Sequence, residues 1–304
     1  MTERLKTDIC VIGAGSGGLS VAAGAAQMGA KVVLIEGHKM GGDCLNYGCV
    51  PSKALIAAAK QAQTVRKGGF GIAPVEPEID YAAAKDYVAE VIKTIEPVDS
   101  QERFEGLGCM VLRDFAEFTS ETEVQAGDTI IEARRFVIAT GSRPFVPPIP
   151  GIEAVPYFTN ETIFDLRGKP EHLIVVGGGP IGLEMAQAHA RLGCKVTVLE
   201  GLKSLGKVDP ELAGIVLERL RDEGVVINEG AQVASVSGEA GAITVQTEDG
   251  QNHLGTHLLV AVGRTPNVDR LNLEAAGIEC DRRGLKVDAN LRTTNRRVYG
   301  VGDV

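Results

Sequence analysis

The sequence contains two copies of one pattern, and this repeat limits the possible fold more than any other feature. Residues 9–37 (ICVIGAGSGGLSVAAGAAQMGAKVVLIEG) and residues 173–201 (LIVVGGGPIGLEMAQAHARLGCKVTVLEG) align at a constant offset of 164 residues, which takes Gly13 to Gly177. Each copy has an apolar run, a glycine turn, a helical segment and a second apolar run that ends in glutamate. This order predicts a strand–helix–strand unit. We therefore expect an α/β fold built from two such units.

The glycine turns in both copies have the G-x-G-x-x-G spacing. The first glycine permits a tight turn, the second lets the backbone approach a pyrophosphate, and the third lets helix and strand pack closely. Glu36 and Glu200 each follow the first glycine of their copy by 23 residues, where a carboxylate can accept hydrogen bonds from ribose hydroxyls. We predict two dinucleotide sites, with glycines at matching positions: Gly13, Gly15 and Gly18, then Gly177, Gly179 and Gly182.

The acid of the second copy also bears on which dinucleotide binds there. A carboxylate at Glu200 would repel the 2′-phosphate of NADP. Lys203 lies nearby, so the local charge is not purely negative. The sequence favours NAD at the second site.

Between the two copies, the segment GGDCLNYGCVPSK (41–53) places two cysteines five positions apart. An Ala-rich helical pattern follows Pro51, so Cys44 and Cys49 are expected in or just before the first turn of a helix. The helix dipole there favours thiolate, which suits thiol exchange. A zinc site would need more ligands than His38 supplies, and no metal is expected. Two unrelated buried thiols are the remaining alternative.

Bulk composition excludes several classes of protein. The 304 residues are 44% hydrophobic and 23% charged, as in a globular chain of about two domains. The net charge of −9 argues against a nucleic-acid or anionic-membrane partner. No apolar run reaches membrane-span length, and we expect a reducing cytoplasm. Six cysteines are too few for a disulfide scaffold. Four of them carry no functional signal: Cys10, Cys109, Cys194 and Cys280.

Segments in a fixed order along the whole chain resemble the class I pyridine nucleotide–disulfide oxidoreductases, an FAD-dependent family. The cysteine segment resembles the redox-active segment of that family. The others resemble its cofactor motifs: the FAD loop IGAGSGG, the second FAD contact VIATGSRPFVPPIPG (137–151), the NAD loop VGGGPIGLE (176–184), the return crossover VAVGRTPN (260–267) and the final FAD motif YGVGDV (299–304).

The resemblance implies a role for each matching residue. Cys49 would be the thiol nearer the flavin, and Cys44 the thiol that exchanges with the substrate. Lys53 would lie beside the flavin, and Glu184 would pair with Lys53. Glu36 would bind the adenosine ribose of FAD. Further cofactor contacts are implied at Gly42, Thr140, Gly141, Gly263 and Asp303.

The implied activity is an FAD- and NAD-linked disulfide oxidoreductase, most like dihydrolipoamide dehydrogenase. Electrons would pass between NAD(H), FAD, a Cys44–Cys49 disulfide and a dithiol or disulfide substrate. Mercuric reductase and glutathione reductase are alternatives, although Glu200 favours the NAD-linked enzyme over the last. A non-catalytic FAD or nucleotide-binding module is the alternative from another class, and retention of both cysteines argues against it.

The motifs also divide the chain. Residues 1–151 are expected to start an FAD-binding domain, residues 152–270 to form an NAD-binding domain, and residues 271–304 to return to the first. Both are expected to be Rossmann-like with strand-meander crossovers. Helices are predicted at 53–67 and 80–105, a strand meander at 107–135, and a hairpin in AITVQTEDGQ (242–251).

Two further expectations follow from the resemblance. Family members form homodimers through a C-terminal domain that supplies a His-Glu base, and we expect this chain to lack that domain and to be impaired alone. Asp43 stands where the family often has threonine, and Tyr47 where small or β-branched residues are usual. A carboxylate at Asp43 must turn away from FAD phosphate or pair with a base. Tyr47 packs near the flavin or gates access to it.

Overall fold

A computed structural model describes residues 3–304, which form two compact units. Unit 1 comprises the chain up to Cys49, Ile92–Arg143 and Arg264–Val304. Unit 2 comprises Val50–Val91 and Pro144–Gly263. The assignment of the sequence ranges to FAD- and NAD-binding domains stays a prediction.

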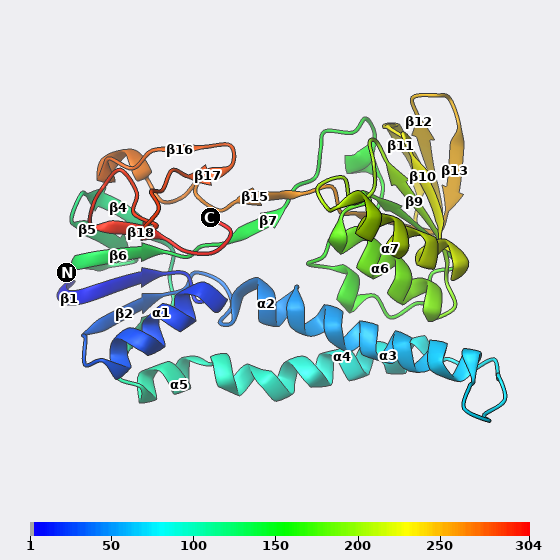
Figure 1. Ribbon diagram of the computed structural model, residues 1–304. Helices are drawn as coiled ribbons and strands as arrows, with labels where there is room; N and C mark the ends of the chain where they lie inside the picture. Colours follow the sequence, from blue (N-terminus) through cyan, green and yellow to red (C-terminus); the bar gives the residue numbers. More distant parts are fainter. Residues whose placement is uncertain (1–2) are drawn as a thin grey trace. The chain divides into compact units, whose positions relative to one another are not determined.

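Unit 1 is organised around a seven-stranded sheet (Figure 1). Its parallel part has buried apolar strands, because helices and connections cover both faces. The order across the sheet is β3 (Met110–Leu112), β2 (Val32–Ile35), β1 (Glu3–Ile12), β6 (Thr129–Ile138), β5 (Glu123–Ala126) and β4 (Ala116–Ser120), with β18 (Val298–Gly300) also paired to β6.

Strand β6 joins three parts of the sequence. Its first half pairs antiparallel with β5, and its second half pairs parallel with β18, where Phe136 lies opposite Val298. Along its other edge it pairs parallel with β1. The buried cluster on one face includes Phe118 and Phe136, whose rings meet edge to face at 5.4 Å. The final motif, YGVGDV (299–304), therefore begins on a strand that pairs with β6, and β6 also pairs with β1.

Unit 2 contains a four-stranded parallel sheet and a three-stranded antiparallel sheet (Figure 1). The parallel order β10-β9-β8-β14 matches the order β3-β2-β1-β6 of unit 1, so the sequence repeat is also a topological repeat. The antiparallel sheet confirms the predicted hairpin, and the predicted Rossmann-like α/β fold is confirmed. The strands are β8 (His172–Val176), β9 (Lys195–Glu200), β10 (Val226–Glu229), β14 (His257–Val260), β11 (Val233–Glu239), β12 (Ala242–Thr247) and β13 (Asn252–Gly255).

The helices differ from the sequence prediction in one place. The helix predicted over 80–105 is wrong as a single element: it ends at Ile95, a 3₁₀ turn follows over Glu96–Asp99, and a new helix starts after Ser100. Ser100 Oγ accepts the backbone N–H of Arg103 at 3.2 Å, which caps the new helix. The α-helices are α1 (Ser16–Gln27), α2 (Gly42–Asn46), α3 (Cys49–Lys67), α4 (Tyr81–Ile95), α5 (Gln101–Gly106), α6 (Pro180–Arg191) and α7 (Pro210–Asp222).

The strand meander predicted over 107–135 is correct only from β4 onward. β3 instead pairs parallel with β2, placing Val111 opposite Leu34 at the far edge of the parallel order. The alternating pattern of CMVLRD fits either a meander strand or a parallel edge strand. Pairing partners are set by the tertiary fold, which periodicity does not report.

Helices α4 and α6 enclose polar side chains in the interior of unit 2. Lys85 is 2% exposed, and its Nζ donates to Ile163 O at 2.8 Å beside the ring of Tyr81. His189 is fully buried, with Nδ1 2.8 Å from Met185 O, so Nδ1 carries the hydrogen. Burial and the Lys85 charge lower the pKa of His189 to about 3, because both disfavour the imidazolium form.

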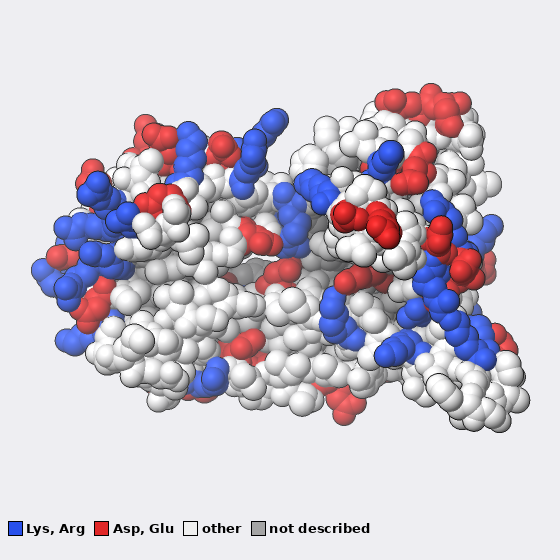
Figure 2. Space-filling model, viewed as in Figure 1, with Lys and Arg blue, Asp and Glu red and all other residues white. Residues whose placement is uncertain are grey.

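Within residues 3–304, none of the helices combines the length and the apolar character needed to cross a bilayer. Basic and acidic side chains are interspersed on the face shown in Figure 2.

We expect the stability of unit 2 to fall as the pH drops from about 6.5 to about 3. Over that range an unfolded chain binds a proton at His189 that the folded chain does not, so stability falls by roughly 2 kcal/mol between pH 7 and pH 5 from this group. Urea unfolding of wild type and His189→Leu across that range measures the effect, with exposed His38→Leu as control. The expectation fails if His189→Leu keeps the full pH slope of the wild type.

Candidate active site

The two glycine turns have the same close approach between backbone atoms. A Cβ on Gly18 would lie 1.8 Å from Gly13 O, and a Cβ on Gly182 would lie 2.1 Å from Gly177 O. These contacts leave no room for a side chain, so the helix after each turn packs directly on the turn. In contrast, no atom lies within 4 Å of the Cβ position of Gly179. The open space at the second glycine is where the sequence places a pyrophosphate.

In both units, the glutamate at the end of the second strand accepts a hydrogen bond from the glycine turn. Glu36 Oε2 accepts the N–H of Ala14 at 2.7 Å, and Oε1 accepts the N–H of His38 at 2.7 Å. Glu200 repeats this arrangement with Gly178 and Leu202, at 2.7 and 2.8 Å. The carboxylates predicted to meet a ribose therefore lie at the turn, at the carboxyl edge of the parallel strands.

Unit 1 brings the segments of the predicted FAD site together. A Cβ on Gly13 would lie 2.3 Å from Ala139 O, next to Thr140 and Gly141. Thr140 is itself fixed, because its Oγ1 donates to Asn267 O at 2.7 Å. The cysteine segment joins at Gly42, where a Cβ would lie 2.7 Å from Gly15 Cα. The final motif also reaches this turn, because Val301 contacts Gly17. Asp303 follows two residues later and is exposed.

Unit 2 brings together the segments of the predicted NAD site in the same way. A Cβ on Gly177 would lie 2.4 Å from Ala261 O, two residues before Gly263. Gly263 has φ +154° and no atom within 4 Å of its Cβ position. Ser204 is buried against the turn, with its Oγ 2.4 Å from the Cβ position of Gly178. Ser204 was not singled out by the sequence, because a serine after the acid carries no signal of its own.

The cysteines lie in two successive helices. Cys44 is half-buried within α2, and Cys49 is exposed as the first residue of α3. Leu45 anchors α2 in the interior, and the side-chain amide of Asn46 donates to Met40 O and Gly42 O at 3.0 and 2.8 Å. The predicted placement of Cys49 in the first turn of a helix is confirmed.

Lys53 lies one turn after Cys49 on the same face of α3. Its Nζ donates to both carboxylate oxygens of Glu184 on α6, at 2.8 and 2.9 Å. The ion pair inferred from the resemblance is present. Both side chains are largely exposed, 62% and 42%, so the pair contributes about 1 kcal/mol or less to stability. Its main effect is to fix the direction of the Lys53 ammonium group.

The two unusual residues of the cysteine segment both have cationic partners. Asp43 Oδ1 accepts from Arg264 Nη2 at 2.9 Å, so the carboxylate pairs with a base, the second of the options left open by the sequence. Lys39 Nζ lies 5.0 Å from the centre of the Tyr47 ring. Arg264 is a site residue that sequence reasoning did not single out, although it stands inside the quoted segment VAVGRTPN.

In the described part of the chain, no group of three or more His, Cys, Asp or Glu residues is placed to hold a metal ion. The donor set instead fits two dinucleotides. Each unit offers a glycine turn at a helix N-terminus for phosphate and a carboxylate at the neighbouring strand end for ribose.

Comparison with known proteins identifies the family. The model of the pyridine nucleotide-disulphide oxidoreductase family matches residues 7–304. The chain belongs to this family, whose members use FAD and NAD(P)H.

Individual relatives carry different names. The chain is 34% identical to a mercuric reductase of Streptomyces lividans over 98% of this chain and 65% of that protein. It is 36% identical to a dihydrolipoyl dehydrogenase of Haloferax volcanii over 98% and 65%. Among solved structures, the HOCl-induced flavoprotein disulfide reductase RclA from Escherichia coli is 31% identical with a TM-score of 0.86, covering 97% of this chain and 66% of that one. The chain therefore spans about two thirds or less of the length of these relatives.

The second and third glycines of the unit 2 turn are expected to respond differently to alanine. Gly179→Ala should fold normally, because no neighbour lies within 4 Å of its Cβ and its φ of −78° suits alanine. Its methyl group would occupy the pyrophosphate position, so NADH affinity should fall roughly tenfold or more.

Gly182→Ala should instead lower the melting temperature, because its Cβ would collide with Gly177 O. Thermal melts and NADH titration by fluorescence separate the two effects, with Gly214→Ala on α7 as control. Unchanged NADH affinity in Gly179→Ala would rule out this turn as the binding site.

Proposed function

We propose that this chain carries the cofactor-binding and redox portion of an FAD- and NAD-dependent disulfide oxidoreductase. The observation that carries the proposal is the position of Cys44 and Cys49. They lie in the successive helices α2 and α3, and their segment contacts the glycine turn of unit 1 where Gly42 packs on Gly15. FAD, when bound, supplies a carrier that exchanges hydride with a pyridine nucleotide and electrons with a thiol pair.

In this proposal each residue has a separate task. Cys49, at the start of α3, is held as a thiolate by the helix N-terminus and is the thiol nearer the flavin. Cys44 exchanges with the substrate: its sulfur attacks a substrate disulfide, one substrate thiolate leaves, and Cys49 then displaces the second to leave a Cys44–Cys49 disulfide. Reduction of that disulfide by two electrons and two protons returns the dithiol.

Lys53 and Glu184 orient charge beside this relay. Glu184 holds the Lys53 ammonium by two hydrogen bonds, which leaves one N–H of the ammonium for another acceptor. We assign Glu36 and Asp303, with Gly13, Gly15, Gly18, Gly42, Thr140 and Gly141, to FAD. Glu200, Gly263 and the glycines of the second turn are assigned to NAD.

For the substrate, we propose a dithiol or disulfide of the lipoamide class, in a homodimer like those of the family. The NAD-favouring acid at Glu200 supports this choice. Hg(II) is the second candidate, because a mercuric reductase is 34% identical across almost all of this chain. Steady-state turnover with lipoamide, glutathione disulfide and Hg(II), each with NADH and NADPH, distinguishes these substrates. A preference for NADPH and Hg(II) would contradict the lipoamide assignment.

The two thiols should be distinguishable by absorbance. In flavin-loaded protein reduced by two electrons, we expect a long-wavelength charge-transfer band from the Cys49 thiolate. Cys49→Ser should abolish this band, because the donor is removed. Cys44→Ser should keep it, because the remaining thiol is the donor itself.

Cys280→Ser, at an exposed cysteine far along the sequence, is the matched control. A band that survives Cys49→Ser but disappears in Cys44→Ser would reverse the assignment of the two thiols. Loss in neither variant would reject the dithiol relay.

A further inference from the structure

Asp43 places a carboxylate inside the cysteine segment, next in sequence to Cys44 and close to the residue before Cys49. It directly precedes Cys44 in the sequence. Its other carboxylate oxygen, Oδ2, lies 2.7 Å from the Cβ position of Gly48, the residue before Cys49. A side chain at position 48 would therefore collide with the carboxylate. A like charge this near a thiolate disfavours it, which is the opposite of what exchange chemistry needs.

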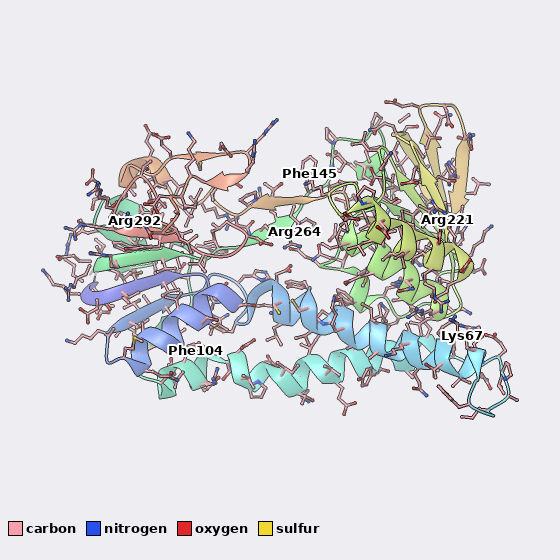
Figure 3. All side chains as sticks on the ribbon, viewed as in Figure 1. Lys67, Phe104, Phe145, Arg221, Arg264 and Arg292 are labelled. Atoms are coloured by element: carbon pink, nitrogen blue, oxygen red, sulfur yellow. The ribbon has the colours of Figure 1, made fainter. Side chains whose placement is uncertain are left out.

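Arg264 compensates this charge and also holds the segment in place. Its Nη2 donates to Asp43 Oδ1 at 2.9 Å and to Ser142 O at 2.6 Å, and its Nε donates to Ser142 Oγ at 2.7 Å. The guanidinium is 19% exposed, whereas the Asp43 side chain is 40% exposed. Figure 3 shows Arg264 at the crossover strands β7 (Ser142–Pro144) and β15 (Arg264–Pro266), which pair with each other.

Two neighbouring cations have described contacts elsewhere. Lys39 lies over the Tyr47 ring. Arg143 on β7 forms an ion pair with Asp269 at 2.7 Å. Among the described contacts around this segment, it is Arg264 that binds the carboxylate of Asp43.

We propose that Arg264 is a positioning residue for the redox segment: it neutralises Asp43 and ties the turn before Cys44 to both crossover strands. This inference rests on the proposed role of Cys44 and Cys49 as an exchange pair. It assigns a double task to one guanidinium, charge compensation through Nη2 and mechanical attachment through Ser142. Removal of the arginine then harms thiol reactivity chiefly because Asp43 remains.

The test measures how fast Cys44 reacts with iodoacetamide, a neutral reagent, in the reduced chain between pH 6 and pH 9. Tandem mass spectrometry assigns the modified cysteine. Arg264→Gln should slow Cys44 alkylation at pH 7 by roughly threefold or more, because an uncompensated carboxylate disfavours thiolate. The double variant Asp43→Asn/Arg264→Gln should regain the wild-type rate, and 1 M salt should reduce the differences.

Three further variants separate charge from structure. Arg264→Lys should keep most of the rate, since it keeps the charge, but melt at a lower temperature, since it loses the forked contact with Ser142. Asp43→Asn alone should react faster than wild type, which tests the idea even if Arg264→Gln does not fold. Arg143→Gln, at the arginine paired with Asp269, should leave the rate unchanged.

Equal slowing in Arg264→Gln and the double variant would show a purely structural role and overturn the proposal. A rate for Asp43→Asn at or below wild type would also overturn it. The order of these rates does not depend on bound FAD or on turnover. The proposal therefore fails or holds separately from the proposed oxidoreductase function, whose failure would appear as a missing charge-transfer band.

Discussion

Both sites depend on a backbone contact that only glycine permits. Where Gly18 and Gly182 pack on the carbonyl oxygens of Gly13 and Gly177, a helix starts directly over the end of a parallel strand. That contact starts the helix at the turn, so its first N–H groups point out of the turn. The second glycine of unit 2 has open space at its Cβ position, whereas that of unit 1 lies against Gly42. The acid of the next strand accepts one backbone N–H from the glycine turn and a second from the residue two positions after the acid itself. In the proposed assignment, these backbone groups and carboxylates would bind the phosphate and the ribose of each dinucleotide.

The same local rule explains why so much of the fold could be predicted from one sequence. Glycine spacing, apolar runs and the distance to the acid are all short-range features of the sequence. Each can be interpreted physically from a few residues. Their repetition at one offset fixed the strand–helix–strand units, and the structure adds that the sheet order is repeated as well. The start of α3 at Cys49 followed from the Ala-rich pattern after Pro51. The pairing of Lys53 with Glu184 needed the resemblance, because residues 131 positions apart have no common local signal.

Other features lay beyond the reach of the sequence for the same reason. The place of β3 beside β2 depends on a partner 77 positions away, since Val33 lies opposite Met110. Lys85 follows a helical pattern that suggests a solvated charge, yet it is buried against α6 and Ile163 O. Each case was decided by a tertiary neighbour.

The contact between Asp43 and Arg264 joins residues 221 positions apart, and it changes how the cysteine segment is understood. From the sequence, the Asp43 carboxylate is expected to turn away from FAD phosphate or to pair with a base. In the structure Asp43 pairs with the Arg264 guanidinium, which also hydrogen-bonds Ser142. The ion pair thus connects the cysteine segment to the crossover strands.

This view also bears on the substrate. A mercuric reductase and a dihydrolipoyl dehydrogenase match almost the same length of this chain, at 34% and 36% identity. Similarity over this portion therefore does not by itself distinguish the two substrates. A reactive thiolate pair attacks disulfides and also binds soft metal ions, so its intrinsic chemistry admits both.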